Sequence, residues 1–209
     1  MMAVRENPPY TDASGTVLRA GPGDLFMLSQ VIADAFYGLA PSQWLVADPD
    51  ARRRIFPAYF QLYVEHALAS GLVFTTPDRA AAAMWIPVRD RPQRPSADYD
   101  TRLAAITDPW TDRFRTFDQE LDRHHPAGCP HHHLAILAVR PDRQGRGIGT
   151  MMLRVHHALL DEQGIPAYLE ASNQHTRAMY LRHGYVDQGA PIQLPGGPLM
   201  FPMWRPPVR

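Results

Sequence analysis

The sequence predicts a mixed α/β (α+β) fold, in which helices pack against a central sheet. Two observations support this prediction. Strand-like apolar runs alternate along the chain with longer segments of helical periodicity. In addition, an apolar strand runs into a glycine-rich turn over residues 136–150, and a helix starts inside that turn. A turn of this kind is typical of α/β proteins that bind phosphorylated ligands.

The first half of the chain carries the signals of two helices and three strands. The expected order is a strand at 16–20, a helix at 25–36, a loop around Trp44, a helix at 48–70, and a hairpin of strands at 72–76 and 80–88. Leu25, Leu28, Ile32 and Phe36 mark the apolar face of the first helix. Pro57 is expected to break or shift the second helix, because proline cannot donate the helical hydrogen bond.

The second half of the chain follows a polar, proline-rich linker at 89–98. The expected order is a helix at 99–124 interrupted near Pro109, a strand at 131–139, a helix that ends at Gly164, a strand at 167–171, a helix at 173–183, and a terminal pair of strands at 185–188 and 199–204. Residues 16–206 are therefore expected to form a single domain, preceded by an N-terminal extension at 1–15.

The composition excludes several classes of protein. The formal net charge of zero provides no electrostatic footprint for nucleic acid or for an anionic membrane. No apolar run is long enough to span a bilayer, and the start of the chain lacks the apolar core of a signal peptide. Cys129 is the single cysteine, which rules out an internal disulfide. These features lead us to expect a cytoplasmic protein.

Three glycines define the turn after the strand at 131–139. Gly145, Gly147 and Gly149 let the backbone bend closely around a ligand. The helix that begins among them presents unpaired N–H groups and the positive end of its dipole. The turn is therefore expected to bind the phosphates of a cofactor.

Two familiar phosphate-binding motifs do not fit this turn. A P-loop needs a lysine followed by serine or threonine, and the chain contains no lysine. The dinucleotide fingerprint needs a glycine where Thr150 stands, although Glu170 lies about twenty residues downstream, as a ribose-binding acid should. A dinucleotide domain starting here would also leave too few residues to complete its sheet.

A third interpretation fits both the turn and a later segment. Gln144-x-x-Gly147-x-Gly149, after a Val-x-Pro strand end, resembles the acyl-CoA pyrophosphate loop of the GNAT acetyltransferase superfamily. Residues 173–185, Asn-Gln-His-Thr-Arg-Ala-Met-Tyr-Leu-Arg-His-Gly-Tyr, are similar to that family's second signature, N-x-x-A-x-x-x-Y-x-x-x-G-F. Thr176 and Tyr185 depart from the signature. The resemblance extends over about residues 16–206 and is most specific over 130–188.

The resemblance implies a central, mixed and mostly antiparallel sheet of about seven strands, in which the fourth and fifth strands diverge. These would be the strands that contain residues 136–139 and 167–171. It also implies acetyl-CoA as cosubstrate and no metal. By the same resemblance, the residues that bind acetyl-CoA would be Leu137, Ala138, Val139, Gln144, Gly145, Arg146, Gly147, Ile148, Gly149, Thr150 and Asn173. Asn173 could equally serve only to cap the helix that follows it.

An acetyl transfer to an amine needs both a base and an acid. An alkyl amine, with a pKa near ~10.4, is almost entirely protonated at pH 7 and must lose a proton before it attacks. The thiolate that leaves CoA must in turn gain one. Tyr180 occupies the general-acid position of the family, although a tyrosine that anchors a helix to the sheet would look the same.

Two residues compete for the role of the base. His131 and His133 share one face of their strand, and a histidine just before this loop resembles those of GNAT enzymes that acetylate arylalkylamines. Glu170 ends the next strand, and its surroundings resemble the puromycin N-acetyltransferase branch. The two candidates are ranked equally. A zinc site made by His124, His125, His131 and Cys129 is disfavoured, because no second ligand cluster at metal spacing supports it.

The acceptor is expected to be a partly apolar small molecule with a primary amine, an antibiotic or a metabolite. Phe36, Tyr37, Trp44 and Trp85 are the candidate substrate-binding residues, although aromatic residues at helix ends usually pack in the core. Acetylation of protein or peptide amines, or a non-catalytic acyl-CoA-binding module, are the alternatives. Neither nucleic acid nor membrane is expected as a partner, and both a monomer and a homodimer are compatible with the sequence.

Overall fold

The computed structural model describes residues 16–91 and 97–208. The predicted N-terminal extension at 1–15, and residues 92–96 of the predicted linker, lie outside the described residues. None of the helices in the described parts of the chain is long and apolar enough to cross a bilayer.

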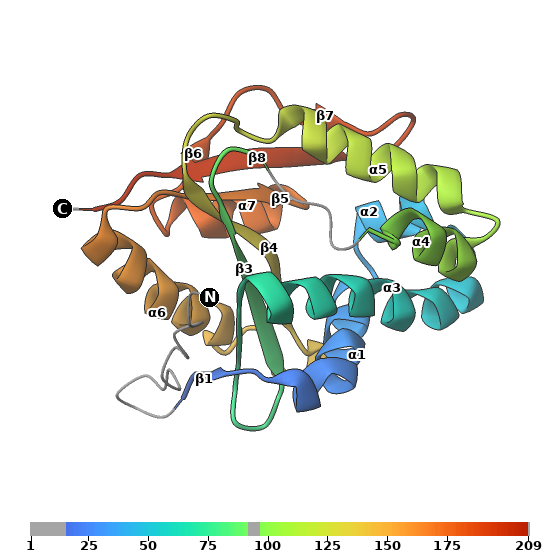
Figure 1. Cartoon of the computed structure of the whole chain (residues 1–209), viewed down its shortest axis with the longest axis horizontal. Coiled ribbons are helices and arrows are strands. Elements are labelled where there is room, and N and C mark those ends of the chain that lie inside the picture. The colour runs from blue at the N-terminus through green and yellow to red at the C-terminus, as the bar shows by residue number, and fades with distance from the viewer. Residues whose placement is uncertain (1–15, 92–96, 209) are drawn as a thin grey trace, which may run out of the picture.

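A mixed sheet of eight strands runs through the molecule (Figure 1). Its order is β1-β2-β3-β4-β5-β8-β6, and β7 pairs with β8 outside this path. The strands are β1 (Leu18–Arg19), β2 (Leu72–Thr75), β3 (Ala81–Val88), β4 (His131–Val139), β5 (Ala167–Ala171), β6 (Val186–Asp187), β7 (Ile192–Gln193) and β8 (Leu199–Arg205). Every pair is antiparallel except β4 with β5. The predicted fold class is confirmed, and β7 is the strand that the sequence pattern did not reveal.

The parallel pair is short, and this opens the sheet. Only His132 with Ala167 and His133 with Tyr168 are in register. Beyond them β4 continues along β3, whereas β5 continues along β8. The predicted divergence of the fourth and fifth strands is thus confirmed, and it begins directly after His133.

Helices cover both faces of the sheet (Figure 1). They are α1 (Leu25–Phe36), α2 (Ala40–Leu45), α3 (Pro49–Ser70), α4 (Tyr99–Thr107), α5 (Thr111–His124), α6 (Ile148–Gln163) and α7 (Gln174–Leu181). Residues of α1, α3, α4 and α5 form one apolar core with alternate residues of β3 and β4, among them Met84 and Ile136. Residues of α6 and α7 form a second core on the other face, with Trp85 and Leu169.

The structure corrects four of the expected elements. The helix α3 is continuous through Pro57, because Phe56 and Phe60 on either side of it are buried in the core and their packing outweighs one missing hydrogen bond. The loop around Trp44 contains the short helix α2. The first strand is limited to two residues, and α7 ends at Leu181, before the predicted His183.

A partly buried ion pair between Arg205 and Asp161 connects β8 to α6. Both guanidinium nitrogens Nη1 and Nη2 of Arg205 donate to the Asp161 carboxylate at 2.7 Å, and the Val208 amide donates to the same carboxylate at 2.8 Å. The Arg205 side chain is only 6% exposed, so its charge depends on this partner. Hydrogen bonds from Arg205, opposed by partial burial, lower the pKa of the Asp161 carboxyl below its ordinary value.

We expect the substitution Asp161→Asn to lower the free energy of unfolding by about 2 kcal/mol at neutral pH, because it leaves the Arg205 charge buried without a counter-ion. Since the Asp161 pKa is lower in the folded protein, its contribution is present above the unfolded-state pKa and is lost as the pH falls through the folded-state value. Urea unfolding at pH 7 and pH 4 measures both effects. The exposed pair of Arg177 and Asp187 is the control, and Asp187→Asn should change stability little. Equal losses for the two variants would contradict this account.

Candidate active site

The glycine-rich turn has the backbone geometry that its sequence predicts. Gly145 and Gly147 have φ values of 73° and 79°, a left-handed conformation that residues with a side chain rarely adopt. Gly147 is the residue before the first turn of α6. Among the described residues, the amides of residues 145–147 donate no hydrogen bond to a backbone or side-chain acceptor. The turn therefore presents unpaired N–H groups at the start of a sixteen-residue helix.

The charges around the turn also suit a phosphate. Arg140 and Arg143 are paired with the carboxylates of Asp142 and Asp78. Arg146 donates instead to the Asp142 carbonyl oxygen at 3.2 Å, and none of the ion pairs in the described chain involves it. Its positive charge therefore remains available to a ligand at the turn.

The other predicted acetyl-CoA-binding residues lie around this turn with different roles. The Gln144 side chain donates to the Val139 carbonyl oxygen at 3.0 Å and so holds the end of β4. The Thr150 hydroxyl lies 3.1 Å from the His183 ring, between α6 and the end of α7. Asn173 caps α7, since its side chain accepts a hydrogen bond of 2.9 Å from the Thr176 amide. Capping explains Asn173 without a ligand.

A β-bulge lies in β4 between its histidines and the turn. Met84 and Trp85 of β3 are consecutive, yet they pair with Ile136 and Leu134, so Ala135 is the extra residue. The bulge reverses the alternation of side chains along the strand. As a result His133 before the bulge and Ile136 after it face the same side of the sheet.

His133 and Glu170 meet where β4 and β5 separate. The His133 Nε2 atom lies 2.9 Å from the Glu170 Oε2 atom, at hydrogen-bond distance. These two residues are 37 positions apart in sequence and were alternative candidates for the base. In the structure they form one histidine–carboxylate pair. The Glu170 side chain is 6% exposed and the His133 side chain 17% exposed, so the histidine is the member of the pair that solvent reaches.

Two further histidines surround this pair. The His125 Nδ1 atom lies 3.8 Å from the Glu170 Oε1 atom, and the His125 Nε2 atom lies 2.9 Å from Nε2 of His131. His131 in turn bonds through Nδ1 to the Cys129 carbonyl oxygen at 2.8 Å. The Tyr168 ring packs against His125 with ring centroids 4.6 Å apart. The carboxylate is thus enclosed by aromatic rings.

The protonation of this cluster follows from burial and charge. Burial lowers the pKa of His125 to about 3, with a further lowering by His133, so His125 is neutral at physiological pH. Burial also lowers the pKa of His131. For Glu170, burial alone would raise the pKa, but the neighbouring His133 outweighs it and holds the pKa below its ordinary value. Glu170 is therefore ionised.

Tyr180 lies on the opposite side of β5 from Glu170. It belongs to the core that α6 and α7 share with Leu169, packs edge-on against Tyr185, and is 8% exposed. Burial raises the pKa of its hydroxyl well above the ordinary range. Tyr180 is therefore fully protonated near neutral pH, the form in which a tyrosine donates a proton.

The four aromatic residues predicted to bind the substrate lie in different surroundings. Trp85 is fully buried and stacks on His156 on the face of the sheet covered by α6, away from His133. This placement arises because alternate residues of β3 face opposite sides, and the contact of Trp85 with the acceptor stays a prediction. Phe36 packs edge-on against Phe60 in the core.

Tyr37 and Trp44 are partly exposed but already have partners. The guanidinium groups of Arg52 and Arg53 lie over the Tyr37 ring at 4.6 and 5.0 Å, so this ring is occupied by cations. The Trp44 Nε1–H donates to the Pro195 carbonyl oxygen at 3.0 Å, and its ring packs against the turn before β8. Trp44 thereby links α2 to the C-terminal strands.

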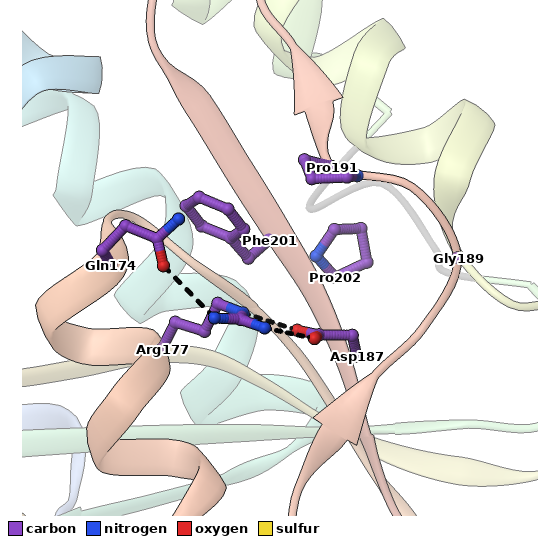
Figure 2. Close-up of a pocket in the computed structure, with 7 residues that line it drawn as sticks. All are labelled: Gln174, Arg177, Asp187, Gly189, Pro191, Phe201 and Pro202. Atoms are coloured by element: carbon purple, nitrogen blue, oxygen red, sulfur yellow. Dashed lines mark hydrogen bonds and ion pairs between the residues drawn. The ribbon is translucent and has the colours of Figure 1, made fainter.

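Figure 2 shows a pocket between α7 and the strands β6 and β8. It is lined by Gln174, Arg177, Asp187, Gly189, Pro191, Phe201 and Pro202. Pro202 pairs in register with Glu170, so the pocket is one strand away from the histidine–carboxylate pair. Arg177 is held by Asp187 and its guanidinium carbon lies 5.7 Å from the centre of the Phe201 ring. No pattern in the sequence pointed to this pocket.

The sequence analysis also missed Tyr168 and, as a partner of Glu170, His125. Tyr168 precedes Glu170 by two residues on a strand and must share its face, a signal that was present in the sequence. His125 follows α5 and reaches Glu170 only through the tertiary fold. It appeared only in the disfavoured zinc site, whose Cys129 is exposed.

Comparison with known proteins shows which family part of the chain resembles. Residues 116–187 match the family model described as "Acetyltransferase (GNAT) domain". Over this segment the chain is therefore similar to a GNAT acetyltransferase domain. Acetyltransferases of this family use acetyl-CoA, for which the glycine-rich turn, its unpaired amides and Arg146 provide suitable phosphate contacts.

Similar solved structures extend over almost the whole chain. A histone acetyltransferase HPA2 and related acetyltransferase from Corynebacterium glutamicum is 25% identical, with 93% of this chain and 97% of that chain covered and a TM-score of 0.69. Arylalkylamine N-acetyltransferase 2 from Aedes aegypti is 9% identical, with 92% and 98% covered and a TM-score of 0.60. A GCN5-related N-acetyltransferase from Rhodopseudomonas palustris is 14% identical, with 95% and 97% covered and a TM-score of 0.56. The sheet and its flanking helices are those of the GNAT fold.

We expect the substitution Gly147→Ala to weaken acetyl-CoA binding by about tenfold, because a left-handed alanine costs roughly 1–2 kcal/mol and the turn must change shape to avoid it. Isothermal titration measures the dissociation constant. Gly164, at the other end of α6, has a φ of 67° and is the matched control. Gly164→Ala should lower stability by a similar amount and leave the dissociation constant unchanged. Equal weakening by both substitutions would contradict a specific role for the turn.

Proposed function

We propose that this protein is an N-acetyltransferase that transfers the acetyl group of acetyl-CoA to the primary amine of a small molecule, by direct attack in a ternary complex. The observation that carries the proposal is the 2.9 Å contact between His133 and Glu170 at the point where β4 and β5 diverge. We also propose that residues 16–206 act as one domain, since a single sheet with a core on each face runs through them.

His133 serves as the general base in this proposal. Its Nε2–H donates to Glu170, which leaves the lone pair of Nδ1 to take a proton from the ammonium of the acceptor, directly or through one water. Glu170 fixes the ring orientation and stabilises the imidazolium that forms. The neutral amine then forms the new C–N bond as the C–S bond of the thioester breaks. Glu170 is thus a positioning residue, and His133 a catalytic one.

Tyr180 supplies the proton that the leaving thiolate needs. Its position in the second signature and its burial support this role, because burial keeps the hydroxyl protonated. Acetyl-CoA itself supplies the activated acetyl group as a thioester. Gly145, Gly147 and Arg146 would hold its pyrophosphate. The backbone of β4 from Leu137 to Val139 has no β5 partner, so its groups on that side could pair with the pantetheine, except the Val139 carbonyl oxygen, which accepts from Gln144.

Two lines of evidence support a small molecule with an amine as the acceptor. The structural neighbours include arylalkylamine N-acetyltransferases, at identities that show the fold alone. The residues around Glu170 and Tyr180 are those that resemble the puromycin N-acetyltransferase branch. A second candidate, acetylation of a protein lysine, is favoured by the description of the Corynebacterium glutamicum neighbour as a histone acetyltransferase and related acetyltransferase.

A titration with acetyl-CoA, followed by a thiol-release assay, tests the function. We expect binding, and release of CoA with at least one of a panel of arylalkylamines and aminonucleosides, including puromycin. A lysine peptide in the same panel is the test of the second candidate, and release with the peptide alone would favour it. Binding without thiol release from any acceptor would favour a non-catalytic module. Absence of binding would overturn the assignment of the turn.

The proposed roles of His133 and Glu170 are tested by substitutions that keep the hydrogen bond between them. In His133→Gln the side-chain amide still donates to Glu170 but cannot accept a proton, and we expect kcat to fall by about 10²–10⁴-fold with the acetyl-CoA dissociation constant unchanged. Glu170→Gln removes the charge that stabilises the imidazolium. We expect kcat to fall by less than in His133→Gln, and to change more than KM does.

His132 provides a matched control on the same strand. It faces the opposite side, where its Nδ1 atom lies 3.0 Å from Nε2 of His156. The substitution His132→Asn keeps a polar atom near the position of Nδ1, and we expect turnover close to that of the wild-type protein. If it loses as much activity as His133→Gln, the effect reflects damage to β4 and not loss of a base.

A further inference from the structure

The Cys129 carbonyl oxygen determines which ring nitrogen carries the proton in His131 and, through His131, in His125. The Cys129 carbonyl oxygen can only accept, so His131 donates to it through Nδ1–H and carries a lone pair on Nε2. The 2.9 Å contact between the two Nε2 atoms then requires His125 to donate from Nε2–H. His125 therefore carries its lone pair on Nδ1, the atom that faces Glu170.

Two electron-pair donors thus face each other in a buried place. The His125 Nδ1 atom and the Glu170 Oε1 atom are 3.8 Å apart, and their side chains are 3% and 6% exposed. The Oε1 atom has no hydrogen bond of good geometry within the described chain, although the Tyr168 hydroxyl, which also has none, lies close enough to lower the pKa of the Glu170 carboxyl. A buried carboxylate oxygen without a donor is unfavourable, and a lone pair directed at it adds repulsion. A cation bound by both atoms would relieve this cost.

The distances suit a small divalent metal ion. One ligand atom from each of His125, His133 and Glu170 lies within 4.8 Å of the other two. Tetrahedral zinc, with bonds of about 2.0–2.2 Å, places its ligand atoms about 3.3 Å apart. The observed separations of 2.9 Å between His133 and Glu170 and 3.8 Å between His125 and Glu170 lie on either side of this value. Two imidazoles and one carboxylate are also a ligand set that zinc uses, with the fourth position left open.

We propose that His125, His133 and Glu170 form a binding site for a zinc ion, and that zinc bound there inhibits acetyl transfer. Binding requires His133 to carry its proton on Nδ1 in place of Nε2, so that Nε2 faces the metal. The lone pair that takes the proton of the amine is then absent. The inhibitory part of this inference rests on the proposed function, whereas the binding of the metal does not.

Cobalt(II) is the probe for the site, because it replaces zinc and absorbs visible light in a tetrahedral environment. The experiment uses the full chain with Cys129→Ser, which removes an exposed thiol that would compete for metal. We expect one equivalent of cobalt to give the tetrahedral spectrum and one equivalent of zinc to abolish it. Acetyl transfer in chelator-treated buffer should fall at least tenfold when one equivalent of zinc is added.

The substitution His125→Gln removes a metal ligand and leaves the proposed base, His133, in place. Its amide nitrogen replaces the Nε2 donor to His131, while the Nδ1 ligand is lost. We expect the cobalt spectrum to disappear, zinc inhibition to weaken at least tenfold, and acetyl transfer without metal to persist. The control His124→Gln changes the neighbouring exposed histidine and should retain the spectrum.

Three results would overturn the proposal. One is a wild-type protein that gives no tetrahedral spectrum with one equivalent of cobalt. Another is a His125→Gln variant that binds cobalt as the parent does. The third is zinc inhibition of equal strength in the two proteins. If the protein shows no acetyl transfer at all, the proposed function fails, and the spectra still decide whether the metal site exists.

Discussion

The two-residue parallel contact between β4 and β5 is the constraint on which the rest of the structure depends. If the pairing continued past His133, Glu170 would lie inside a closed ladder and the backbone of β4 beyond the bulge would have no free groups. Because the strands separate, β4 follows β3 and β5 follows β8, and each strand keeps enough hydrogen bonds to remain in the sheet. The short register between β4 and β5 thus both opens space for a cofactor and positions the Glu170 carboxylate.

The separation of the strands also divides the histidines of β4 between two environments. His133 faces an ionised carboxylate, whereas His132, on the other side, contacts His156, whose ring in turn packs against Trp85. Burial lowers the pKa of His132 to about 4 and that of His156 to about 2, so both are neutral near pH 7 and contribute packing and a hydrogen bond. Adjacent histidines in one strand therefore have different chemistry, which is decided by what the facing strand or helix presents.

Local pattern was sufficient for most elements, and tertiary contacts decided the rest. The periodicity of 25–36, the turn at 139–150 and the signature at 173–185 act over short distances, so the sequence predicted them. Pro57 was misjudged because the propensity of one residue was weighed without the burial of Phe56 and Phe60. The strand β7 has only two residues and no periodic signal. The surroundings of Trp85 were not predictable, because a sequence does not say which face of β3 meets which layer of helices.

The same limit explains why His133 and Glu170 looked like alternatives. Each fits a base when considered alone, because a histidine titrates near neutral pH and a carboxylate at a strand end often meets a cation. Only the register of His133 with Tyr168 shows that Glu170, two residues on, is near enough to accept from the imidazole. In the proposed function this contact gives the two candidates separate roles, with His133 as the base and Glu170 as its partner. A buried carboxylate whose pKa is held low is a poor base toward an ammonium, but a good partner for an imidazole that must gain a proton. The solvent-facing position of His133 and the enclosed position of Glu170 are consistent with these roles and would be difficult to reconcile with the reverse assignment.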